Sequence, residues 1–516
     1  MELFKKYIDS NYSFYKKNNF SKKCNIVLFL VSKDIYTTSL TMRFAKARSD
    51  VLKKNLIVIP NITLTSNSKK TVQSFYPSRI LDFRLKIFKI IFLNLFKLLK
   101  LNKKIIIGED LINLKIDEVR IGKHLYDYLL VKYKLLSVEK ITLKHRFTFS
   151  TDILYYLCSI DFLKKEENPI IILPDNVYRH GAIFEYAKNN SLNCLTALSL
   201  TEFTIHKFDS SESFKEHCRT PSLEFVEEII SNNSLMEHAK KSFEDRILGV
   251  GDQHDVIRAY AKEKIEISRE ELINIMRLNP EKPIILVAAH IFSDAPHANN
   301  DLIFKDFYEW LLVTCLELKK NNDLNFVIKE HPTSNLYGES NKTFGALKKL
   351  SLEDKLLPNN IKTNSLFNLV DVLITCGGTA AMEFAYHGIP NLIASKPPYY
   401  KFGFSDISES KTEYINKLKT VHEKRKLSTS QRNNALAMLY IFDKLQKMDN
   451  LNYVIGSQKT YLGVNKDLTL FMEEMIEDTK IQIGYKSLKE SLSIFFSQRE
   501  RNLISNKLIH KFNLEV

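Results

Sequence analysis

Short apolar runs alternate with helix-patterned segments along most of this chain, and no other feature of the sequence constrains its fold more. In the first half, apolar runs predict strands over residues 25–31, 55–59, 104–107, 169–173 and 194–198. Strands separated by helical stretches indicate a parallel sheet with helices on its faces. We therefore predict an α/β domain in this half of the chain.

A second sheet is predicted from Pro283 onwards. Its strands are expected over residues 284–289, 324–328, 370–375 and 391–394, with helices over 304–318 and 380–387. The last of these helices has a defined end, because Gly388 favours a left-handed C-cap and Pro390 cannot continue a helix. After residue 427 only helices are expected.

The length of 516 residues exceeds what one hydrophobic core usually supports, so several domains are expected. We predict a Rossmann-like N-terminal domain with its connector over residues 1–255 and a second Rossmann-like domain over 256–426. A helical tail over 427–516 is expected to pack back on these domains. With 44% apolar and 26% charged residues, the composition excludes global disorder.

The net charge of +15 has two interpretations. It suits an anionic partner, such as a phosphate-bearing substrate or a lipid surface. It is also typical of a chain rich in Lys, Asn and Ile, in which the lysines are spread evenly. The basic residues form no stripe with interleaved aromatic residues, so we expect no nucleic-acid partner.

The six cysteines are scattered, without a CxxC pair or metal-ligand spacing. This usage is typical of reduced core residues in a cytosolic protein. The N-terminus lacks the apolar stretch and cleavage site of a signal peptide, and no run reaches the roughly 18 apolar residues of a spanning helix. We therefore expect a cytoplasmic protein.

Residues 80–99, which begin at Ile80 and end at Leu99, come closest to a membrane segment. Asp82 and three lysines interrupt this apolar stretch at helical spacing, giving a narrow polar stripe. One interpretation is a buried helix packed on a sheet. The other is an in-plane helix at the inner face of the cytoplasmic membrane, which suits an enzyme with a lipid-linked acceptor.

The strongest ligand-binding pattern follows the predicted strand 370–375. Ligands of doubly wound sheets bind beyond the carboxyl ends of the strands. There, Gly377 and Gly378 let the backbone approach a ligand, and Thr379 can cap the next helix, whose free N–H groups face an anion such as a phosphate. Glu383, one turn later, can accept hydrogen bonds from ribose hydroxyls. The alternative is a tight turn followed by a solvated glutamate.

The stretch from Asp371 to Pro390 resembles the donor-nucleotide segment of GT-B glycosyltransferases, in which a Gly-rich turn and a helix bearing Glu hold the nucleotide sugar. Lys329-Glu330-His331-Pro332 resembles the His-Pro motif of bacterial capsule polysaccharide transferases, including Kdo transferases and some sialyltransferases. The resemblance implies that His331 contacts the donor phosphate and that Lys329 supports it electrostatically. It covers residues 281–400 at the level of motifs, and implies two Rossmann-like domains facing a cleft. It also implies that the domain over 1–255 binds the acceptor and the domain over 256–426 the nucleotide-sugar donor. The Asp/Glu-Asp-Gly signature of several sialyltransferase families is absent.

The loop after strand 284–289 carries His290, Ser293, Asp294 and His297. We expect these side chains to line the cleft near the donor phosphates, with Asp294 orienting one of the histidines. Plain stabilisation of the loop is the alternative. A zinc site lacks a second ligand motif elsewhere in the chain, so no metal is expected.

A transferase also needs a base for the acceptor hydroxyl, and we expect it from the first domain. Asp175 and His180, which follow strand 169–173, are the candidates, with Asp127 behind them. The alternative to a catalytic role is a hydrogen-bonded surface residue for the aspartates and a helix cap for the histidine. No DxD motif is present, which favours a metal-independent mechanism without a cofactor besides the nucleotide-sugar co-substrate.

Together with the resemblance, these residues predict an inverting glycosyltransferase. Its donor is expected to be a nucleotide-linked sugar, with a CMP-linked acidic sugar such as Kdo favoured, and its acceptor a surface polysaccharide (capsule or lipopolysaccharide) or a lipid-linked glycan. A UDP-N-acetylhexosamine 2-epimerase or a glycerophosphate polymerase is the alternative among enzymes. A non-catalytic, nucleotide-sugar-binding assembly protein is the alternative from another class.

Overall fold

The computed structural model describes residues 2–16, 20, 24–30, 35–60, 65–81, 83, 91, 100–101, 103–198, 204–250, 254–298, 302–446, 468–498, 500, 502–512 and 514. The chain forms two compact units. The first unit comprises Met1–Tyr126, Lys140–Cys218 and Leu445–Val516. The second unit comprises Asp127–Glu139 and Arg219–Lys444.

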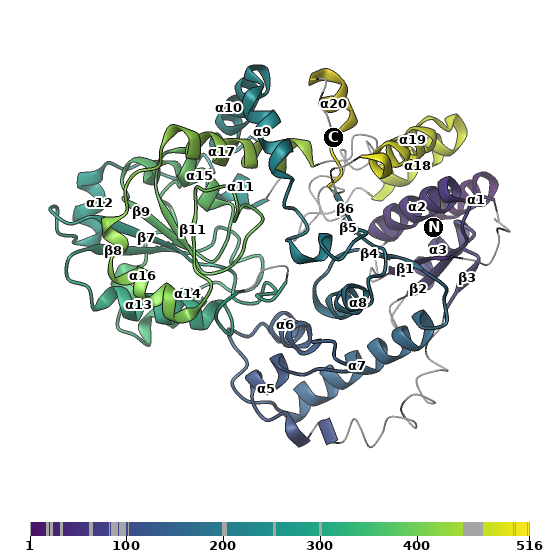
Figure 1. Ribbon diagram of the computed structural model, residues 1–516, viewed down its shortest axis with the longest axis horizontal. Coiled ribbons are helices and arrows are strands. Elements are labelled where there is room, and N and C mark those ends of the chain that lie inside the picture. The colour runs from purple at the N-terminus through teal and green to yellow at the C-terminus, as the bar shows by residue number, and fades with distance from the viewer. Residues whose placement is uncertain are drawn as a thin grey trace. The chain divides into compact units, whose positions relative to one another are not determined.

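The first unit contains a six-stranded sheet in the order β3-β2-β1-β4-β5-β6 (Figure 1). All neighbouring strands are parallel except β5 and β6. This order reverses between β1 and β4, as in Rossmann folds. The strands are β1 (Ile26–Leu30), β2 (Leu56–Pro60), β3 (Arg79–Ile80), β4 (Ile170–Leu173), β5 (Cys194–Leu198) and β6 (Thr204–Phe208).

Helices surround this sheet, and β1 and β4 are buried along their whole length because both faces are covered. The helices are α1 (Glu2–Phe14), α2 (Ile35–Leu52), α3 (Ser66–Ser74), α5 (Gly108–Ile112), α7 (Leu143–Leu163), α8 (Tyr178–Asn189), α18 (Leu468–Ile481), α19 (Ile483–Ser497) and α20 (Asn506–Phe512). Helix α6 (Gly122–Tyr133) contains the first boundary between the units.

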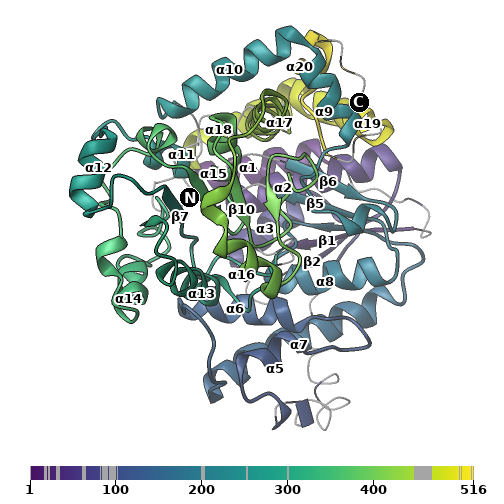
Figure 2. The ribbon, with the colours of Figure 1, turned by 60° about the vertical axis from the view of Figure 1, so that its left-hand side comes forward.

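The C-terminal helices complete the core of the first unit. Helix α18 packs on α1 and helix α19 on α2, as Figure 2 shows. Their side chains Phe471 and Leu488 join the same apolar cluster as Leu28 of β1. Arg43 of α2 is fully buried and forms an ion pair with Asp478 of α18.

The second unit contains a parallel five-stranded sheet in the order β11-β10-β9-β7-β8. The chain passes from β7 to β8 on one side and then to β9 on the other side of β7. The order therefore reverses between β7 and β9. The strands are β7 (Ile284–Ala288), β8 (Asn325–Lys329), β9 (Val372–Thr375), β10 (Asn391–Ile393) and β11 (Asp406–Ile407).

The helices of the second unit are mostly short. They are α9 (Leu223–Ser231), α10 (Asn233–Ile247), α11 (His254–Ala259), α12 (Arg269–Met276), α13 (Phe307–Lys319), α14 (Lys342–Lys348), α15 (Ala380–Tyr386), α16 (Lys411–Lys419) and α17 (Thr429–Tyr440). Asp306 caps α13 by accepting the N–H of Glu309, so that helix begins three residues later than predicted. The end of α15 agrees with the prediction, because Gly388 has a φ of +83° and Ile389 donates to the carbonyl of Phe384.

The predicted fold class is confirmed: two α/β sheets of Rossmann type are followed by C-terminal helices. One predicted strand, over residues 104–107, is wrong. The carboxylate of Asp110 accepts the backbone N–H groups of Ile106 and Ile107, and helix α5 begins directly afterwards. Only an isolated bridge pairs Ile107 with Lys140. Strands β3, β6 and β11 were not predicted.

The division into units differs from the predicted boundaries at 255 and 426. Residues 219–255 lie with the second unit, and residues 445–516 with the first. Helices α9 and α10 from the expected connector pack on α17 within the second unit. The sequence after 427 is thus shared between the units.

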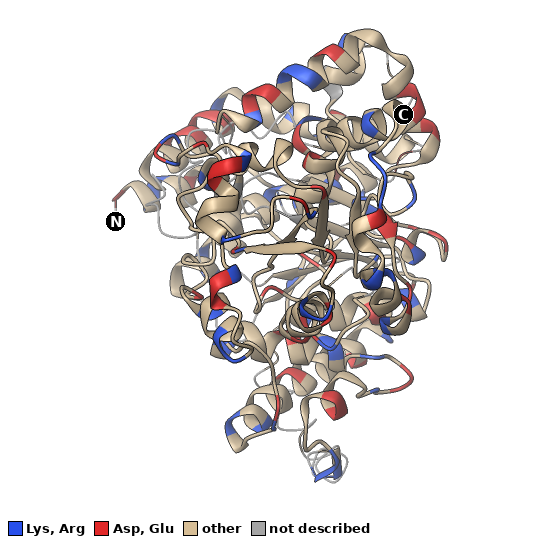
Figure 3. Ribbon diagram, turned by 90° about the vertical axis from the view of Figure 1, so that its left-hand side faces the viewer, with Lys and Arg blue, Asp and Glu red and all other residues tan. Residues whose placement is uncertain are grey.

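The apolar stretch 80–99 lies almost entirely outside the described residues, so the structure does not test it. No helix in the described part of the chain is long and apolar enough to cross a bilayer. In the view of Figure 3, basic and acidic residues are interspersed along the ribbon, so the net charge of +15 does not arise from one basic element.

Candidate functional site

Polar residues from three neighbouring strands of the second unit line one pocket. It lies at the carboxyl ends of β7, β8 and β9, where the strand order reverses and doubly wound sheets bind ligands. Of the residues predicted to bind the donor, six line it: His290, Lys329, His331, Gly378, Thr379 and Glu383. Four do not: Ser293, Asp294, His297 and Gly377.

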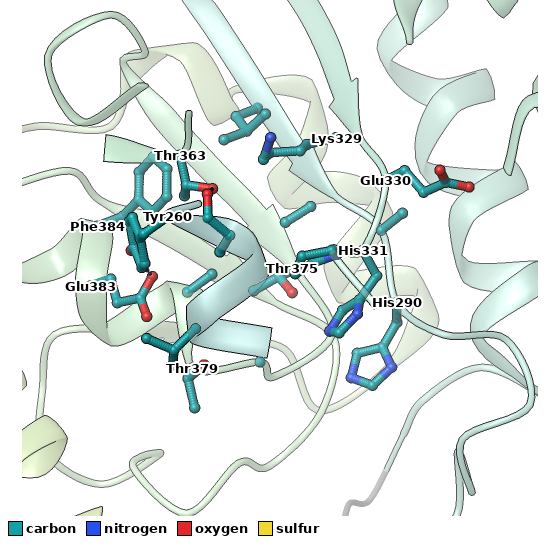
Figure 4. Close-up of a pocket in the computed structure, with 18 of the residues that line it drawn as sticks. Tyr260, His290, Lys329, Glu330, His331, Thr363, Thr375, Thr379, Glu383 and Phe384 are labelled. Atoms are coloured by element: carbon teal, nitrogen blue, oxygen red, sulfur yellow. Dashed lines mark hydrogen bonds between the residues drawn. The ribbon is translucent and has the colours of Figure 1, made fainter. Parts of the chain in front are cut away.

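Two neutral histidines lie side by side at one end of the pocket (Figure 4). The ring centroids of His290 and His331 are 5.8 Å apart, and His290 stacks on Phe307 at 4.1 Å. Burial lowers the pKa of His290 to about 4 and that of His331 to about 3, so both rings are uncharged at neutral pH.

The tautomer of His331 follows from its hydrogen bond. Its Nδ1 accepts the backbone N–H of Thr333 at 3.3 Å. The proton of the neutral ring is therefore on Nε2. This gives the pocket an N–H donor whose protonation does not change near neutral pH.

Lys329 lies at the end of β8 and is buried. Its Nζ donates to the carbonyl of Ile361 at 3.1 Å, and no carboxylate partner is found for it among the described residues. Burial, with repulsion from Lys264, lowers the pKa of Lys329 to about 7. The neighbouring Glu330 points away from the histidines in Figure 4 and accepts a hydrogen bond from Asn359. A bound anion would therefore be a favourable partner for Lys329.

The two glycines after β9 have different roles. Gly377 has a φ of +144°, and a Cβ there would lie 2.9 Å from Oγ of Ser395, so this position requires glycine. Gly378 lines the pocket, and a Cβ there would meet nothing closer than 3.9 Å. Thr379 occupies the N-cap position of α15 but makes no side-chain capping bond, contrary to the expectation. Its Oγ1 instead lies 3.5 Å from Nη2 of Arg246.

Glu383 is anchored on the opposite side of the pocket from the histidines (Figure 4). Its Oε1 accepts a hydrogen bond from Nε of Arg246 and its Oε2 one from the hydroxyl of Tyr260, both at 2.7 Å. Arg246 also binds Asp443 through Nη1, at 3.0 and 2.9 Å. The carboxylate is therefore buried and fixed in position by these two hydrogen bonds.

Arg246 and Tyr260 line the pocket but were not predicted from the sequence. Arg246 lies on α10, in the expected connector, and Tyr260 lies directly after α11, near the start of the domain predicted over 256–426. Neither belongs to a motif, and each is far in sequence from Glu383. Their one possible signal is general: a buried glutamate such as Glu383 needs a cation, and Arg246 could have been sought for that reason.

Two carboxylates hold the loop that carries Ser293, Asp294 and His297. Glu339 accepts the backbone N–H groups of Phe292 and Ser293 at 2.8 and 3.0 Å. Asp127 accepts the N–H of His297 at 3.1 Å and contacts its ring Nδ1 at 2.7 Å. The carboxylate that orients a loop histidine is therefore that of Asp127, and not that of Asp294.

Asp294 lies among other acids. Burial raises its pKa to about 6, with repulsion from Glu339 and Asp127 adding to the effect. Asp127 itself is fully buried.

In the described parts of the chain, no three His, Cys, Asp or Glu side chains are grouped as metal ligands.

Asp175 and His180 form a pair in the first unit. They follow β4, next to the point where the strand order of that sheet reverses. Oδ1 of Asp175 lies 3.0 Å from Nδ1 of His180 and also accepts the N–H of Val177. The other ring nitrogen of His180, Nε2, is buried without a hydrogen-bond partner among the described residues.

No protein-family model and no curated protein matches this sequence. Solved structures that are similar include the beta-Kdo 2,4-transferase KpsC of Thermosulfurimonas dismutans, which is 11% identical over 60% of this chain and 88% of its own, with a TM-score of 0.30. The UDP-GlcNAc 2-epimerase of Methanocaldococcus jannaschii is 10% identical over 81% of this chain and 98% of its own, with a TM-score of 0.27. A glycosyltransferase of Rickettsia africae is 10% identical over 91% of this chain and 99% of its own, with a TM-score of 0.25. At these identities and TM-scores, no residue role transfers to this chain.

Proposed function

We propose that this chain is a glycosyltransferase that binds a nucleotide-activated sugar in the pocket of the second unit. One observation carries the proposal: the loops after β7, β8 and β9 bring His290, His331 and Gly378 to the same pocket at the reversal of strand order. Pockets at such reversals bind nucleotides in doubly wound sheets.

The two ends of the pocket suit the two ends of a nucleotide. At the histidine end, the Nε2–H of His331 is a donor that suits a phosphate. The buried Nζ of Lys329 lines the same pocket, without a carboxylate partner among the described residues, and adds a cation that favours an anionic ligand. At the other end, Glu383 is fixed by Arg246 and Tyr260, and each of its oxygens has a second lone pair for a ribose hydroxyl. We assign the phosphates to the histidine end and the ribose to the Glu383 end.

For the acceptor hydroxyl we assign His180 as the base and Asp175 as the residue that orients it. The pairing of Nδ1 with Asp175 and the unpartnered Nε2 support this choice. Asp127 suits the role less, because both of its oxygens are bonded to His297.

The finer assignment follows from the His-Pro resemblance. We propose an inverting, metal-independent transfer of a CMP-linked acidic sugar such as Kdo onto a surface polysaccharide or lipid-linked glycan, in the cytoplasm. An epimerase would convert a UDP-sugar without any acceptor. An assembly protein would bind the nucleotide sugar without turnover.

The test is a thermal-shift comparison of CMP, CDP, UDP and GDP with the full chain. A ligand that binds only the folded state raises the melting temperature, so the nucleotide that gives the shift identifies the donor class. His331→Ala should abolish that shift, whereas His422→Ala, a control outside the pocket, should retain it. If no nucleotide raises the melting temperature, or if His331→Ala leaves the shift unchanged, the proposal is wrong.

A further inference from the structure

The start of helix α7 and the segment paired with it expose large apolar side chains. Leu143 and Phe147 are 85% and 74% exposed, the highest values for large apolar residues in the described part of the chain. Ile106 and Ile107 are 62% and 41% exposed. We call these four residues the apolar corner. Contiguous exposed apolar groups mark interaction surfaces in proteins that are otherwise soluble.

The apolar corner is part of regular structure. Leu143 is the first residue of α7, and Phe147 lies one turn later on the same face. Thr142 caps this helix by accepting the N–H of His145. From Thr148 onwards most of the helix is buried, so α7 is anchored in the first unit and projects only its first turn.

The two isoleucines are held beside this turn. The N–H of Ile141 donates to the carbonyl of Ile106 at 2.9 Å, and Ile107 forms a bridge with Lys140. The carboxylate of Asp110 accepts the N–H groups of both isoleucines at 2.8 and 3.0 Å. Figures 1 and 2 both show α5, which begins at the next residue, beside the start of α7.

Cations flank the apolar corner. Lys103, Lys104, Lys140 and Lys144 are exposed, and Arg146 is partly exposed. No ion pair is found for Lys103, Lys104 or Lys140 among the described residues. The acids in the same stretches are fewer: they are Glu109, Asp110 and Glu139, and Asp110 already binds two backbone N–H groups.

We propose that the apolar corner and its flanking lysines attach this chain to a membrane surface that contains anionic lipids. The apolar side chains would enter the layer below the headgroups, and the lysines would pair with headgroup phosphates. Charge complementarity supports this occupant, because exposed apolar residues with exposed lysines next to them in the chain match the chemistry of an anionic bilayer surface. The proposal does not rest on the transferase assignment, but it would bring a transferase to a lipid-linked acceptor.

The experiment is co-sedimentation of the full chain with vesicles of phosphatidylcholine, alone or mixed with phosphatidylglycerol. We expect binding to the mixed vesicles and an at least about tenfold loss of it in the double variant Leu143→Gln/Phe147→Gln. The matched control is Ile481→Gln/Ile483→Gln, which removes apolar side chains that are 54% and 68% exposed elsewhere in the same unit, and should bind like the wild type.

Charge is tested separately. The triple variant Lys103→Gln/Lys104→Gln/Lys140→Gln should weaken binding to the mixed vesicles, and added salt should weaken binding of the wild type. The control Lys215→Gln/Lys240→Gln/Lys320→Gln removes the same number of exposed charges at other places and should have little effect.

Several results would overturn the proposal. The proposal is wrong if the wild type does not bind the mixed vesicles. It is also wrong if the Leu143→Gln/Phe147→Gln variant binds them as strongly as the wild type does. Concentration-dependent self-association that this variant abolishes, without any vesicle binding, would show a protein interface instead. Unchanged melting temperatures would verify that the variants fold. Their nucleotide-induced shift should remain, which separates this proposal from the assignment of the pocket.

Discussion

Nε of Arg246 lies 2.7 Å from Oε1 of Glu383, and this buried ion pair joins helix α10 to helix α15 in the wall of the pocket. Helix α10, which lies in the segment expected to be a connector, therefore supplies the cation that pairs with Glu383. Burying a carboxylate without such a partner would be strongly destabilising.

Replacing Arg246 with Met should destabilise the second unit. Glu383 and Asp443 would both lose their cation, and removing one partner of a buried pair costs about 3–5 kcal/mol. Urea denaturation would measure the change in the free energy of unfolding. Arg432→Met is the control, because Arg432 donates to the Tyr386 carbonyl at an exposed position and should cost about 1 kcal/mol or less. A similar loss in both variants would contradict the assigned role of Arg246.

Nucleotide affinity should fall as pH rises above 7. The pKa of Lys329 is about 7 in the free protein, so deprotonation of its Nζ above this pH removes a charge that a phosphate would bind. The loss should approach about tenfold per pH unit if only the charged form binds. Isothermal titration calorimetry between pH 7 and pH 9 would measure it. Lys329→Arg should bind with a much flatter pH dependence, and an equally steep dependence in that variant would refute this explanation.

Asp294 should make the protein less stable as pH rises from about 4 to 6. Its pKa is about 6 in the folded chain against an ordinary value of 3.8, so the folded state holds the proton more tightly in this window. Stability falls with rising pH wherever the folded state binds more protons. Asp294→Asn should remove this contribution, about 3 kcal/mol at neutral pH, and gain stability relative to the wild type at pH 7. Thermal unfolding at pH 4 and pH 7 would check this, and parallel curves for both proteins would contradict it.

The two glycines of the turn after β9 should respond differently to alanine. Gly377→Ala should cost about 1–3 kcal/mol of stability, because φ is +144° and the new Cβ would meet Ser395. Gly378→Ala has room for its methyl group and should fold normally, but that group would narrow the pocket and weaken nucleotide binding. Melting temperature and nucleotide affinity separate the two effects. Equal melting temperatures for both variants would show that the turn does not need a glycine at 377.

The sequence predicted those parts of the fold that depend on apolar runs. Strands such as β4 and β7 consist almost wholly of Ile, Leu and Val, so their positions were evident. Strand β3 has only two residues, and β6 contains His206 and Lys207, so neither has an apolar run to detect. Residues 104–107 have such a run, but they form no strand, because the N–H groups of Ile106 and Ile107 donate to the carboxylate of Asp110 and a helix follows.

The part of the candidate site that could be predicted consists of residues that follow apolar strands. His290, His331 and Gly378 each follow a detectable strand, and parallel strands bring their carboxyl ends to one edge of a sheet. Arg246 and Tyr260 reach the pocket from helices outside that pattern. Their positions depend on how α10 and α11 pack, which no local pattern in the sequence specifies.

The C-terminal helices of the first unit have a consequence for how the chain folds during synthesis. Phe471, Leu488 and other C-terminal residues complete a core whose remaining buried members lie between Tyr7 and Ile205. The ribosome completes every residue of the second unit before it makes these helices. The second unit can therefore fold first. Until helices α18 and α19 are made, one apolar face of the sheet in the first unit stays uncovered. A stop codon near residue 445 would leave that face uncovered, and the product would be a ready substrate for chaperones and proteases.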